Sequence, residues 1–564
     1  ATSDATLTLP SPGATNSLGA NKAIVIDNTV PVFSSVSPSS SSTASNTNVG
    51  YTLSEAISSG SIVWTRTGGT ADGSSPHTAA LAGSELNTGS YSGALTNAPT
   101  LVNGTIYTIT FNGTDPAGNT ASQVSITGFT YDNYDVESDP SGYTAFTSPG
   151  NTTYYINYSS GNDSNNGTSE ATAFKNLGKL NSITFAGGDV IKFNSGDIWK
   201  GYFKLNGSGG SSSSLITIDK YGSGNKPIID GNGYQASIFI ENKQYIEIKN
   251  IELKNDASHL KPNGSVKLMS GSSRSGNEER YGLLFLISSS GTNYNTFKIN
   301  GVKVHEVYSS AAVSADGSNR YEGRGVAFES LSGIDNYFDG IEIDNLEVRN
   351  TSWIGLHFRN QLSSADANYY HRNITVKNSH FEDTGGSGIV FARTKDVLVQ
   401  GSVFKGTGSD NDSRMWNRGS GLWVFTSNDV IVQENTFENA YGSQDSFGAH
   451  IDWGNERVVI QYNLSKNNHG GFAEILGENI DCGYRYNISI GDGTRTGEHK
   501  GKVFWISDFA GSDDRRIGSQ NNFIYNNTVF IPSTNPTNGN AMNPNLLIRA
   551  NTENTIIYNN LIYI

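Results

Sequence analysis

A histidine and an aspartate lie two residues apart in the stretch GAHIDWGN, residues 448–455. If this stretch is a β-strand, alternate side chains point to the same face. His450 and Asp452 would then lie side by side, while Ala449 and Ile451 face the other way. An imidazole next to a carboxyl can hold or transfer a proton during catalysis. The stretch predicts either the floor of an active site or an ordinary solvent-facing pair.

A second acid, Glu474, follows Asp452 by 22 residues. If those residues form one coil of a stacked structure, the two carboxyls lie on neighbouring strands, about 4.8 Å apart. Carboxyls this close raise the pKa of one of them, which places a proton donor beside a base or nucleophile. Such pairs hydrolyse glycosidic bonds. The two carboxyl groups are about 5–5.5 Å apart in retaining enzymes and about 6.5–9.5 Å apart in inverting enzymes. Asp445 and Asp508 are alternative partners for Asp452.

The segments GVAFES, GLHFRN, GIVFAR, GLWVFT, GAHIDW and GGFAEI align with one another. Their second and fourth residues are mostly apolar and are expected to face a core, while the third and fifth face outward. Beginning the last segment at Gly470 aligns Glu474 with Asp452. The outward strip then contains large aromatic and charged side chains: Glu329, His357, Arg359, Trp423, Phe425 and Phe472. Exposed aromatic rings on a bare surface are unusual, and rings stack on the C–H faces of sugars. The strip therefore predicts a glycan-binding groove.

Basic residues precede or follow the same segments. They are Arg393, Arg414, Arg418 and Lys500, with Trp416 between two of them, and Lys502, Arg515 and Arg516 further on. The chain carries a net charge of −14, so cations gathered near one strip favour an anionic glycan, either a uronate or a sulfate ester. Arginine suits these anions because its guanidinium presents a fork of donors.

The composition restricts the class of protein. Only 16% of the 564 residues are charged, and Gly (64), Tyr (27) and Phe (25) are abundant, which is typical of an all-β protein with many turns. The sequence contains no run of 18 apolar residues, so no membrane span is predicted. The negative net charge argues against a nucleic-acid partner. The single cysteine, Cys482, excludes an intramolecular disulfide. The first residues show no signal peptide, so we expect a secreted, monomeric protein from which it has been removed.

The first part of the chain has short alternating runs such as GTIYTITFNGTD. The phrase DPAGNTASQVSITGFTYDN has a partial twin in NSLGANKAIVIDNTVP, which predicts the tail of one module followed by a complete one. This pattern resembles tandem bacterial immunoglobulin-like modules, whose expected role is that of a spacer. The predicted boundaries are 1–28 for the tail, 29–132 for the β-sandwich module and 133–150 for a linker.

From residue 151 to residue 564, short strands repeat with an Asn or Gly between them. The aligned turn residues are Asn250, Asn300, Asn345, Asn378, Gly401, Asn435, Asn463, Asn487, Asn527 and Asn560. Repetition on this scale predicts a solenoid, because each coil buries its apolar face only by stacking on the next. Stacked Asn side chains can hydrogen-bond along the axis, and Asn or Gly tolerates a left-handed corner. The prediction is a parallel β-helix.

This repeat resembles the right-handed β-helices of secreted carbohydrate-active enzymes, which include pectate lyases, polygalacturonases and degraders of algal polysaccharides. The resemblance implies an endo-acting glycoside hydrolase on an anionic polysaccharide such as a sulfated fucan. Asp452 and Glu474 would catalyse, assisted by His450, and the outward and loop residues named above would bind substrate.

Two other functions stay open. A polysaccharide lyase on the same fold would use a basic residue to remove a proton. Asp445, Asp452 and Glu474 would then neutralise charge or hold calcium. The Asp/Asn-rich run 409–412 is a weak calcium-loop candidate. A non-catalytic glycan-binding solenoid is the third reading, although loops of uneven length favour an enzyme. No cofactor is required by the hydrolase hypothesis, and calcium is left open.

Overall fold

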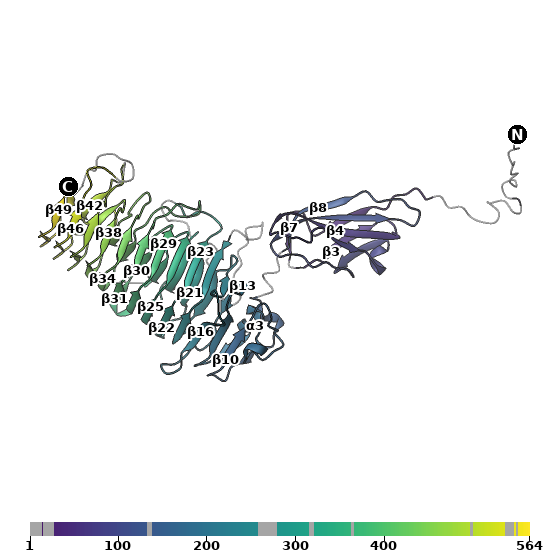
Figure 1. Cartoon of the computed structure of the whole chain (residues 1–564), viewed down its shortest axis with the longest axis horizontal. Coiled ribbons are helices and arrows are strands. Elements are labelled where there is room, and N and C mark those ends of the chain that lie inside the picture. The colour runs from purple at the N-terminus through teal and green to yellow at the C-terminus, as the bar shows by residue number, and fades with distance from the viewer. Residues whose placement is uncertain are drawn as a thin grey trace. The chain divides into compact units, whose positions relative to one another are not determined.

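The computed structural model describes residue 14 and residues 27–44, 46–131, 138–257, 279–314, 321–362, 366–496, 500–535, 546–548 and 551–564. The chain divides into two compact units, residues 1–133 and 134–564 (Figure 1). The predicted tail over residues 1–28 lies almost wholly outside the described residues.

The first unit is a β-sandwich. One sheet contains β1 (Phe33–Ser37), β3 (Val49–Leu53) and β6 (Gly89–Gly93); the other contains β2 (Thr43–Ala44), β8 (Val124–Tyr131), β7 (Thr105–Thr114), β4 (Ser59–Gly69) and β5 (His77–Ala80). Nearly all pairs are antiparallel. Alternate residues of β7 are buried, and Trp64, Tyr107 and Phe111 are fully covered in the core between the sheets. This is the packing of an immunoglobulin-like sandwich.

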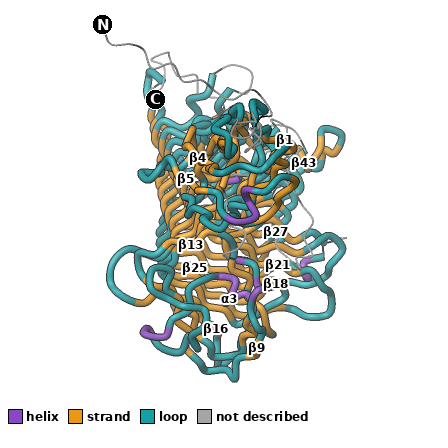
Figure 2. Tube along the Cα trace, turned by 90° about the vertical axis from the view of Figure 1, so that its right-hand side faces the viewer, coloured by secondary structure: helices purple, strands orange, loops and turns teal. Residues whose placement is uncertain are grey.

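The second unit is a right-handed parallel β-helix with three long parallel sheets (Figure 2). The first sheet contains β10 (Thr153–Ile156), β12 (Val190–Asn194), β16 (Ile216–Tyr221), β19 (Ile246–Lys249), β22 (Tyr294–Asn300), β25 (Phe338–Asp344), β28 (His371–Lys377), β31 (Thr394–Gln400), β34 (Asn428–Gln433), β37 (Glu456–Gln461), β40 (Gly483–Arg485), β45 (Phe523–Tyr525) and β48 (Ile556–Tyr558).

The second sheet contains β13 (Ile198–Lys200), β17 (Ile228–Asp230), β20 (Glu252–Asp256), β23 (Lys303–Tyr308), β26 (Glu347–Thr351), β29 (His380–Thr384), β32 (Val403–Lys405), β35 (Thr436–Glu438), β38 (Leu464–Lys466), β41 (Ile488–Ile490), β46 (Thr528–Phe530) and β49 (Leu561–Tyr563). The third contains β14 (Phe203–Lys204), β18 (Ala236–Glu241), β21 (Arg280–Ile287), β24 (Gly323–Ser330), β27 (Leu356–Asn360), β30 (Ile389–Ala392), β33 (Leu422–Phe425), β36 (Ala449–Ile451), β39 (Gly471–Ile475), β42 (Lys502–Ile506) and β47 (Leu546–Ile548).

Each coil visits the first, second and third sheets in turn, so that the all-β prediction and the solenoid prediction are both confirmed. Smaller elements accompany the early coils and the loops: β9 (Phe146–Thr147), β11 (Ile183–Phe185), β15 (Asn206–Gly207), α3 (Leu177–Asn181), the hairpin β43 (Phe509–Ser512) with β44 (Arg515–Arg516), and 3-10 turns at Pro140–Gly142, Glu170–Thr172 and Ala367–Tyr369. A further 3-10 turn, Gly83–Leu86, belongs to the first unit.

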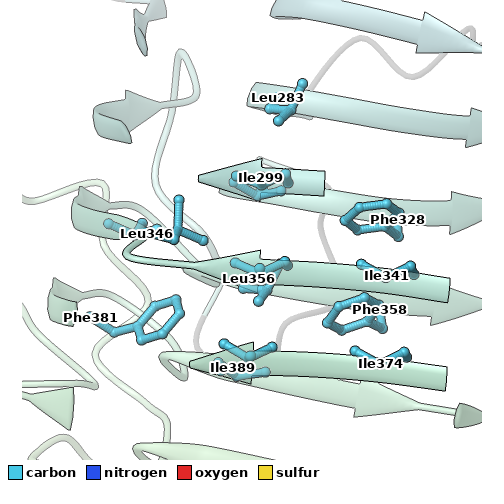
Figure 3. Packing of buried hydrophobic residues seen from close by; sticks show 14 of the residues in the cluster. Leu283, Ile299, Phe328, Ile341, Leu346, Leu356, Phe358, Ile374, Phe381 and Ile389 are labelled. Carbon is cyan, nitrogen blue, oxygen red and sulfur yellow. The ribbon is translucent and has the colours of Figure 1, made fainter. Parts of the chain in front are cut away.

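The core of the solenoid consists of like residues stacked from coil to coil (Figure 3). The rings of Phe328, Phe358 and Phe391 lie nearly parallel, with centroids 5.3 and 5.1 Å apart. This spacing is close to the distance between neighbouring strands. One apolar column therefore runs along the axis and fixes the register of the third sheet.

The turn residues that were aligned in the sequence occupy different positions at the corner between the first and second sheets. From β19 onward, the residue after each first-sheet strand has a left-handed backbone, as at Asn250, Asn345 and Gly401. From Asn435 onward, the aligned asparagines instead occupy the next position, where they are buried or half-buried. There Asn435, Asn463, Asn487, Asn527 and Asn560 form a ladder in which each Nδ2 donates to the next Oδ1 over 2.9–3.1 Å.

Candidate active site

The outward face of the third sheet contributes to two cavities. The aromatic pocket, about 300 Å³, is lined by His357, Arg359 and Asp452 together with Trp353, Trp416, Trp423, Phe425 and Trp453. The charged pocket, about 290 Å³, lies toward later coils and is lined by Asp445, Glu474 and Trp505 together with Arg418, Arg495, Lys502, Asp513 and Arg516. The strands supply the floors of both pockets, and the loops supply the walls.

The register between β36 and β39 differs from the predicted one. Ile451 pairs with Ile475, and Phe447 pairs with Gly471. Glu474 therefore lies beside His450 rather than beside Asp452. The alternation of faces was predicted correctly, but the alignment was two residues out. The loop before β39 is longer than the alignment allowed, since Gly470 is still in the loop.

His450 lies between two acids from different pockets. Its Nε2 is 3.2 Å from Oε2 of Glu474 and 4.0 Å from Oδ1 of Asp452, without hydrogen-bond geometry in either case. The ring stacks on Trp423 with centroids 5.2 Å apart, and its side chain is 1% exposed. Burial lowers the pKa of His450 to about 4, so the imidazole is neutral at physiological pH.

Asp452 directly follows β36 and is almost fully buried. Its Oδ2 accepts a hydrogen bond of 2.7 Å from Nε1 of Trp423, while Oδ1 has no hydrogen-bond partner among the described residues. Burial raises the pKa of Asp452 to about 7, and the negative charge of Asp445 adds to this, whereas the Trp423 hydrogen bond opposes it. At neutral pH the carboxyl is divided between its protonated and ionised forms.

Glu474 and Asp445 differ although they line the same pocket. Burial, followed by the charges of Asp445 and Asp452, raises the pKa of Glu474 well above its ordinary value, so Glu474 keeps its proton. Asp445 instead accepts a 2.7 Å hydrogen bond from Nε of Arg418 in a charge-assisted pair. The two acids of this pocket therefore differ in their partners, since Glu474 has no hydrogen-bond partner among the described residues and Asp445 is paired with Arg418.

A buried charge network supports the far wall of the aromatic pocket. Arg324 is completely buried and pairs with Glu322, Glu279 and Glu329. Its Nε donates to Nδ1 of His357 over 3.1 Å. Because a guanidinium only donates, this bond assigns the Nε2–H tautomer to neutral His357. Glu329 thus belongs to the support of the pocket rather than to its lining.

Several predicted substrate-binding residues have structural partners instead. Arg414 pairs with Asp256 and Asp412, and Arg393 donates to the backbone oxygens of Asn360 and Leu362. Neither arginine lines the pockets described, and neither does exposed Lys500. Each was predicted from nearness in sequence alone.

Two further predictions also change. Phe472 was predicted to face outward, but as the second residue of β39 it is buried in the core, where its ring packs against Tyr484 and Phe504. Asp508 lies beside the charged pocket, between the lining residues Ser507 and Phe509 in the chain. Its carboxyl accepts hydrogen bonds from Asn551 and Arg516 over 3.1 and 3.5 Å. It stands outside the cluster around His450.

Four residues of the pocket walls were not predicted from the sequence. Trp353, Trp453, Arg495 and Trp505 all line the two pockets. Trp453 is the last residue of the aligned segment GAHIDW, and Trp505 lies three residues before Asp508, so aromatic residues near the predicted acids were a usable signal. Trp353 and Arg495 come from loops whose path the sequence pattern does not specify.

Among the residues described, one group of three acids has the spacing of a metal site: Asp27, Glu55 and Asp115 in the first unit. Asp445, Asp452 and Glu474 do not form such a group, so the pockets offer no ready calcium cage from these three acids. No helix in the described part of the chain has the length and apolarity to cross a membrane.

Comparisons with known proteins agree with this architecture. Residues 285–487 match a family model described as a right handed beta helix region, and residues 27–131 match one described as a bacterial Ig-like domain. Both predicted resemblances are confirmed at the level of fold.

Among curated proteins, the chain is similar to a lacto-N-biosidase of Bifidobacterium longum subsp. longum, with 24% identity over 69% of this chain. The match spans only 28% of that relative's length. Among solved structures, a GH136 lacto-N-biosidase from Eubacterium ramulus aligns at a TM-score of 0.49 and 17% identity, covering 73% of this chain and 68% of that one. The family 28 exopolygalacturonase of Yersinia enterocolitica aligns at a TM-score of 0.32 and 9% identity, covering 94% and 99%.

Proposed function

We propose that this protein is a glycoside hydrolase that cleaves a glycan where the aromatic and charged pockets meet. The observation that carries the proposal is the state of Asp452: 5% exposed, with a pKa raised to about 7, in a pocket lined by tryptophans. A carboxyl of this kind is still protonated in part of the molecules at neutral pH and can donate its proton to a leaving oxygen.

Asp445 is the proposed second group. Asp445 is ion-paired with Arg418 and lines the neighbouring pocket. As the glycosidic C–O bond breaks, the proton of Asp452 goes to the departing oxygen. Asp445 either removes a proton from the attacking water or attacks the anomeric carbon, after which water releases the sugar. Glu474 and His450 hold Asp452 in a low-dielectric setting, so they are positioning residues in this scheme.

The two pockets also indicate which substrate parts they would accept. The rings of Trp353, Trp416 and Trp453 suit the C–H faces of pyranoses. In the charged pocket, Arg418, Arg495, Lys502 and Arg516 outnumber the three acids of the lining, Asp445, Glu474 and Asp513. This excess of cations supports an anionic substituent, a uronate or a sulfate ester as in a sulfated fucan. Endo-action and an extracellular location belong to the same proposal.

The bifidobacterial relative adds separate support for a glycan-degrading enzyme, since its name is that of a glycosidase. Its name also introduces a neutral substrate to be tested against the anionic one. A lacto-N-bioside should therefore stand beside anionic polysaccharides in any assay.

The experiment incubates the whole chain with a lacto-N-bioside, polygalacturonate, alginate and a sulfated fucan, and follows reducing ends together with ultraviolet absorbance. We expect new reducing ends without an unsaturated product. Asp452→Asn and Asp445→Asn should each lower kcat by about 10²–10⁴-fold. Asp513→Asn is a matched control, because Asp513 lines the charged pocket and is exposed at its rim.

The outcomes separate the alternatives. Rising absorbance would replace hydrolysis by β-elimination, with the acids acting as charge neutralisers. Turnover of the lacto-N-bioside alone would retain the hydrolase and remove the anionic substrate. Undiminished activity in Asp452→Asn would contradict the catalytic assignment.

A further inference from the structure

The corner between the first and second sheets has an unusual feature in two coils. In the ten described coils from β19 to β48, the corner residue has φ between +49° and +67°. These residues are Asn250, Gly301, Asn345, Asn378, Gly401, Glu434, Tyr462, Tyr486, Asn526 and Asn559. Seven are Asn or Gly, which tolerate this left-handed conformation. A tyrosine there is strained, so Tyr462 and Tyr486 lower stability compared with the residues at the same corner elsewhere.

The two tyrosines do not stabilise the core in return. Tyr462 is 53% exposed and Tyr486 is 42% exposed. Their rings lie face to face, with centroids 5.2 Å apart and an interplanar angle of 9°. The hydrogen bonds of this corner come from the residues that follow them, Asn463 and Asn487. The tyrosines therefore form an exposed aromatic platform that the turn does not need.

Planar polar groups flank this platform in register; Gln461, only 9% exposed, lies beneath it and orients Gln433 and Arg485 on either side. Gln433 pairs with Gln461, and Gln461 pairs with Arg485, at the ends of consecutive first-sheet strands. Gln461 donates to Gln433 over 2.8 Å, and Arg485 donates to Gln461 over 2.8 Å. Gln433, Gln461, Tyr462, Arg485 and Tyr486 are here called the corner strip. Its spacing along the axis is one coil, about 4.8 Å.

We propose that the corner strip is a second carbohydrate-binding surface, separate from the third-sheet pockets and taking an extended polysaccharide chain. Aromatic faces bind the C–H faces of sugar rings, while amide, guanidinium and phenol groups exchange hydrogen bonds with hydroxyls. All five strip residues combine a flat face with a polar edge, and none is aliphatic. This composition favours a glycan over a protein partner, for which exposed Ile488 on the next strand would be the better anchor.

The strip lies on a different sheet from the pockets, so its occupation leaves the proposed catalytic groups unobstructed. A chain held there would keep the protein on an insoluble or long substrate. The proposal does not depend on hydrolysis, since binding can be measured whether or not any glycan is cleaved.

The test uses the double variant Tyr462→Asn/Tyr486→Asn in the full chain. Asparagine occupies the same corner in other coils, so this variant should fold and should unfold at an equal or higher temperature. Glu434→Asn is the matched control, because it makes the same change one coil earlier without removing a ring. Migration is compared in native gels containing xylan, alginate, polygalacturonate or a sulfated fucan.

We expect at least one polysaccharide to retard the wild-type protein and the Glu434→Asn control equally. The double variant should bind that polysaccharide about tenfold more weakly. Equal retardation of the double variant would overturn the proposal, and so would an absence of retardation of the wild-type protein in every gel. If the double variant is retarded as much as the wild-type protein but sediments differently in analytical ultracentrifugation, the strip would instead be a surface for protein–protein association.

Discussion

Two regions of the solenoid differ in whether their buried polar groups are hydrogen-bonded. At the corner between the first and second sheets, Asn463, Asn487 and Asn527 use their amides fully, each donating to the next and accepting from the one before. Beside the third sheet, both ring nitrogens of His450, both oxygens of Glu474 and one oxygen of Asp452 lack hydrogen-bond partners among the described residues.

This difference separates stability from function. Buried polar atoms without partners cost free energy, so a region that keeps several of them together is under a constraint other than folding. Hydrogen bonds at catalytic groups often form only when substrate is bound. The Asn ladder holds the coils in register, whereas the cluster around His450 is left incomplete within the protein.

The largest expected effect concerns the pH dependence of stability. The pKa of Asp452 is raised from 3.8 to about 7 in the folded state, so its contribution to stability is fully present below pH 3.8 and is lost as pH rises through about 7. Asp452→Asn cannot ionise. We therefore expect the variant to gain stability relative to the wild-type protein between these pH values, by up to about 4 kcal/mol.

Urea unfolding of both proteins at pH 5 and pH 8 checks this expectation. The comparison uses the difference between the two proteins, because His450, whose pKa is lowered to about 4, contributes the opposite trend at acid pH in both. A difference that stays constant with pH would mean that Asp452 is not a desolvated acid, and the contrast between the two regions would fail.

The next effect tests the Asn ladder. Asn487 is 1% exposed, accepts from the backbone N and Nδ2 of Asn463, and donates to Ile460 and Asn527. Asn487→Ala leaves several of these groups unpaired, so we expect a loss of about 2–4 kcal/mol in the free energy of unfolding. Thr528→Ala, at an exposed position one coil away, should cost little. Equal losses of unfolding free energy in the two variants would show that the Asn ladder does not stabilise the fold.

The fold could be predicted further than the site, for a physical reason. Apolar alternation repeats from coil to coil, and from β19 onward an Asn or Gly lies at the corner or directly after it, so errors at single positions, such as Asn300 taken for Gly301, do not change the architecture. His450 and Asp452 were found because strand alternation alone places them on one face.

Other parts of the site depend on information that alternation lacks. A loop of different length before β39 placed Glu474 beside His450, and Phe472, the second residue of that strand, packs into the core although alternation predicted an outward side chain. The partners of Arg414 include Asp256, which is 158 residues away in sequence. Only the folded chain could show that this arginine holds a loop in place while Arg495 lines a pocket.

The smallest effect refines the account of the proposed acid. Trp423 donates to Oδ2 of Asp452, and this hydrogen bond favours the ionised form. Trp423→Phe keeps a ring against His450 but removes the donor, so the pKa of Asp452 should rise further. The upper limb of the pH profile of kcat/KM, where the acid loses its proton, should move to higher pH. Trp453→Phe is the control, since Trp453 assists Asp452 only through its backbone. If both variants shift the limb equally, the exclusion of water from the aromatic pocket determines the pKa of Asp452. The indole N–H of Trp423 then makes no separate contribution to that pKa.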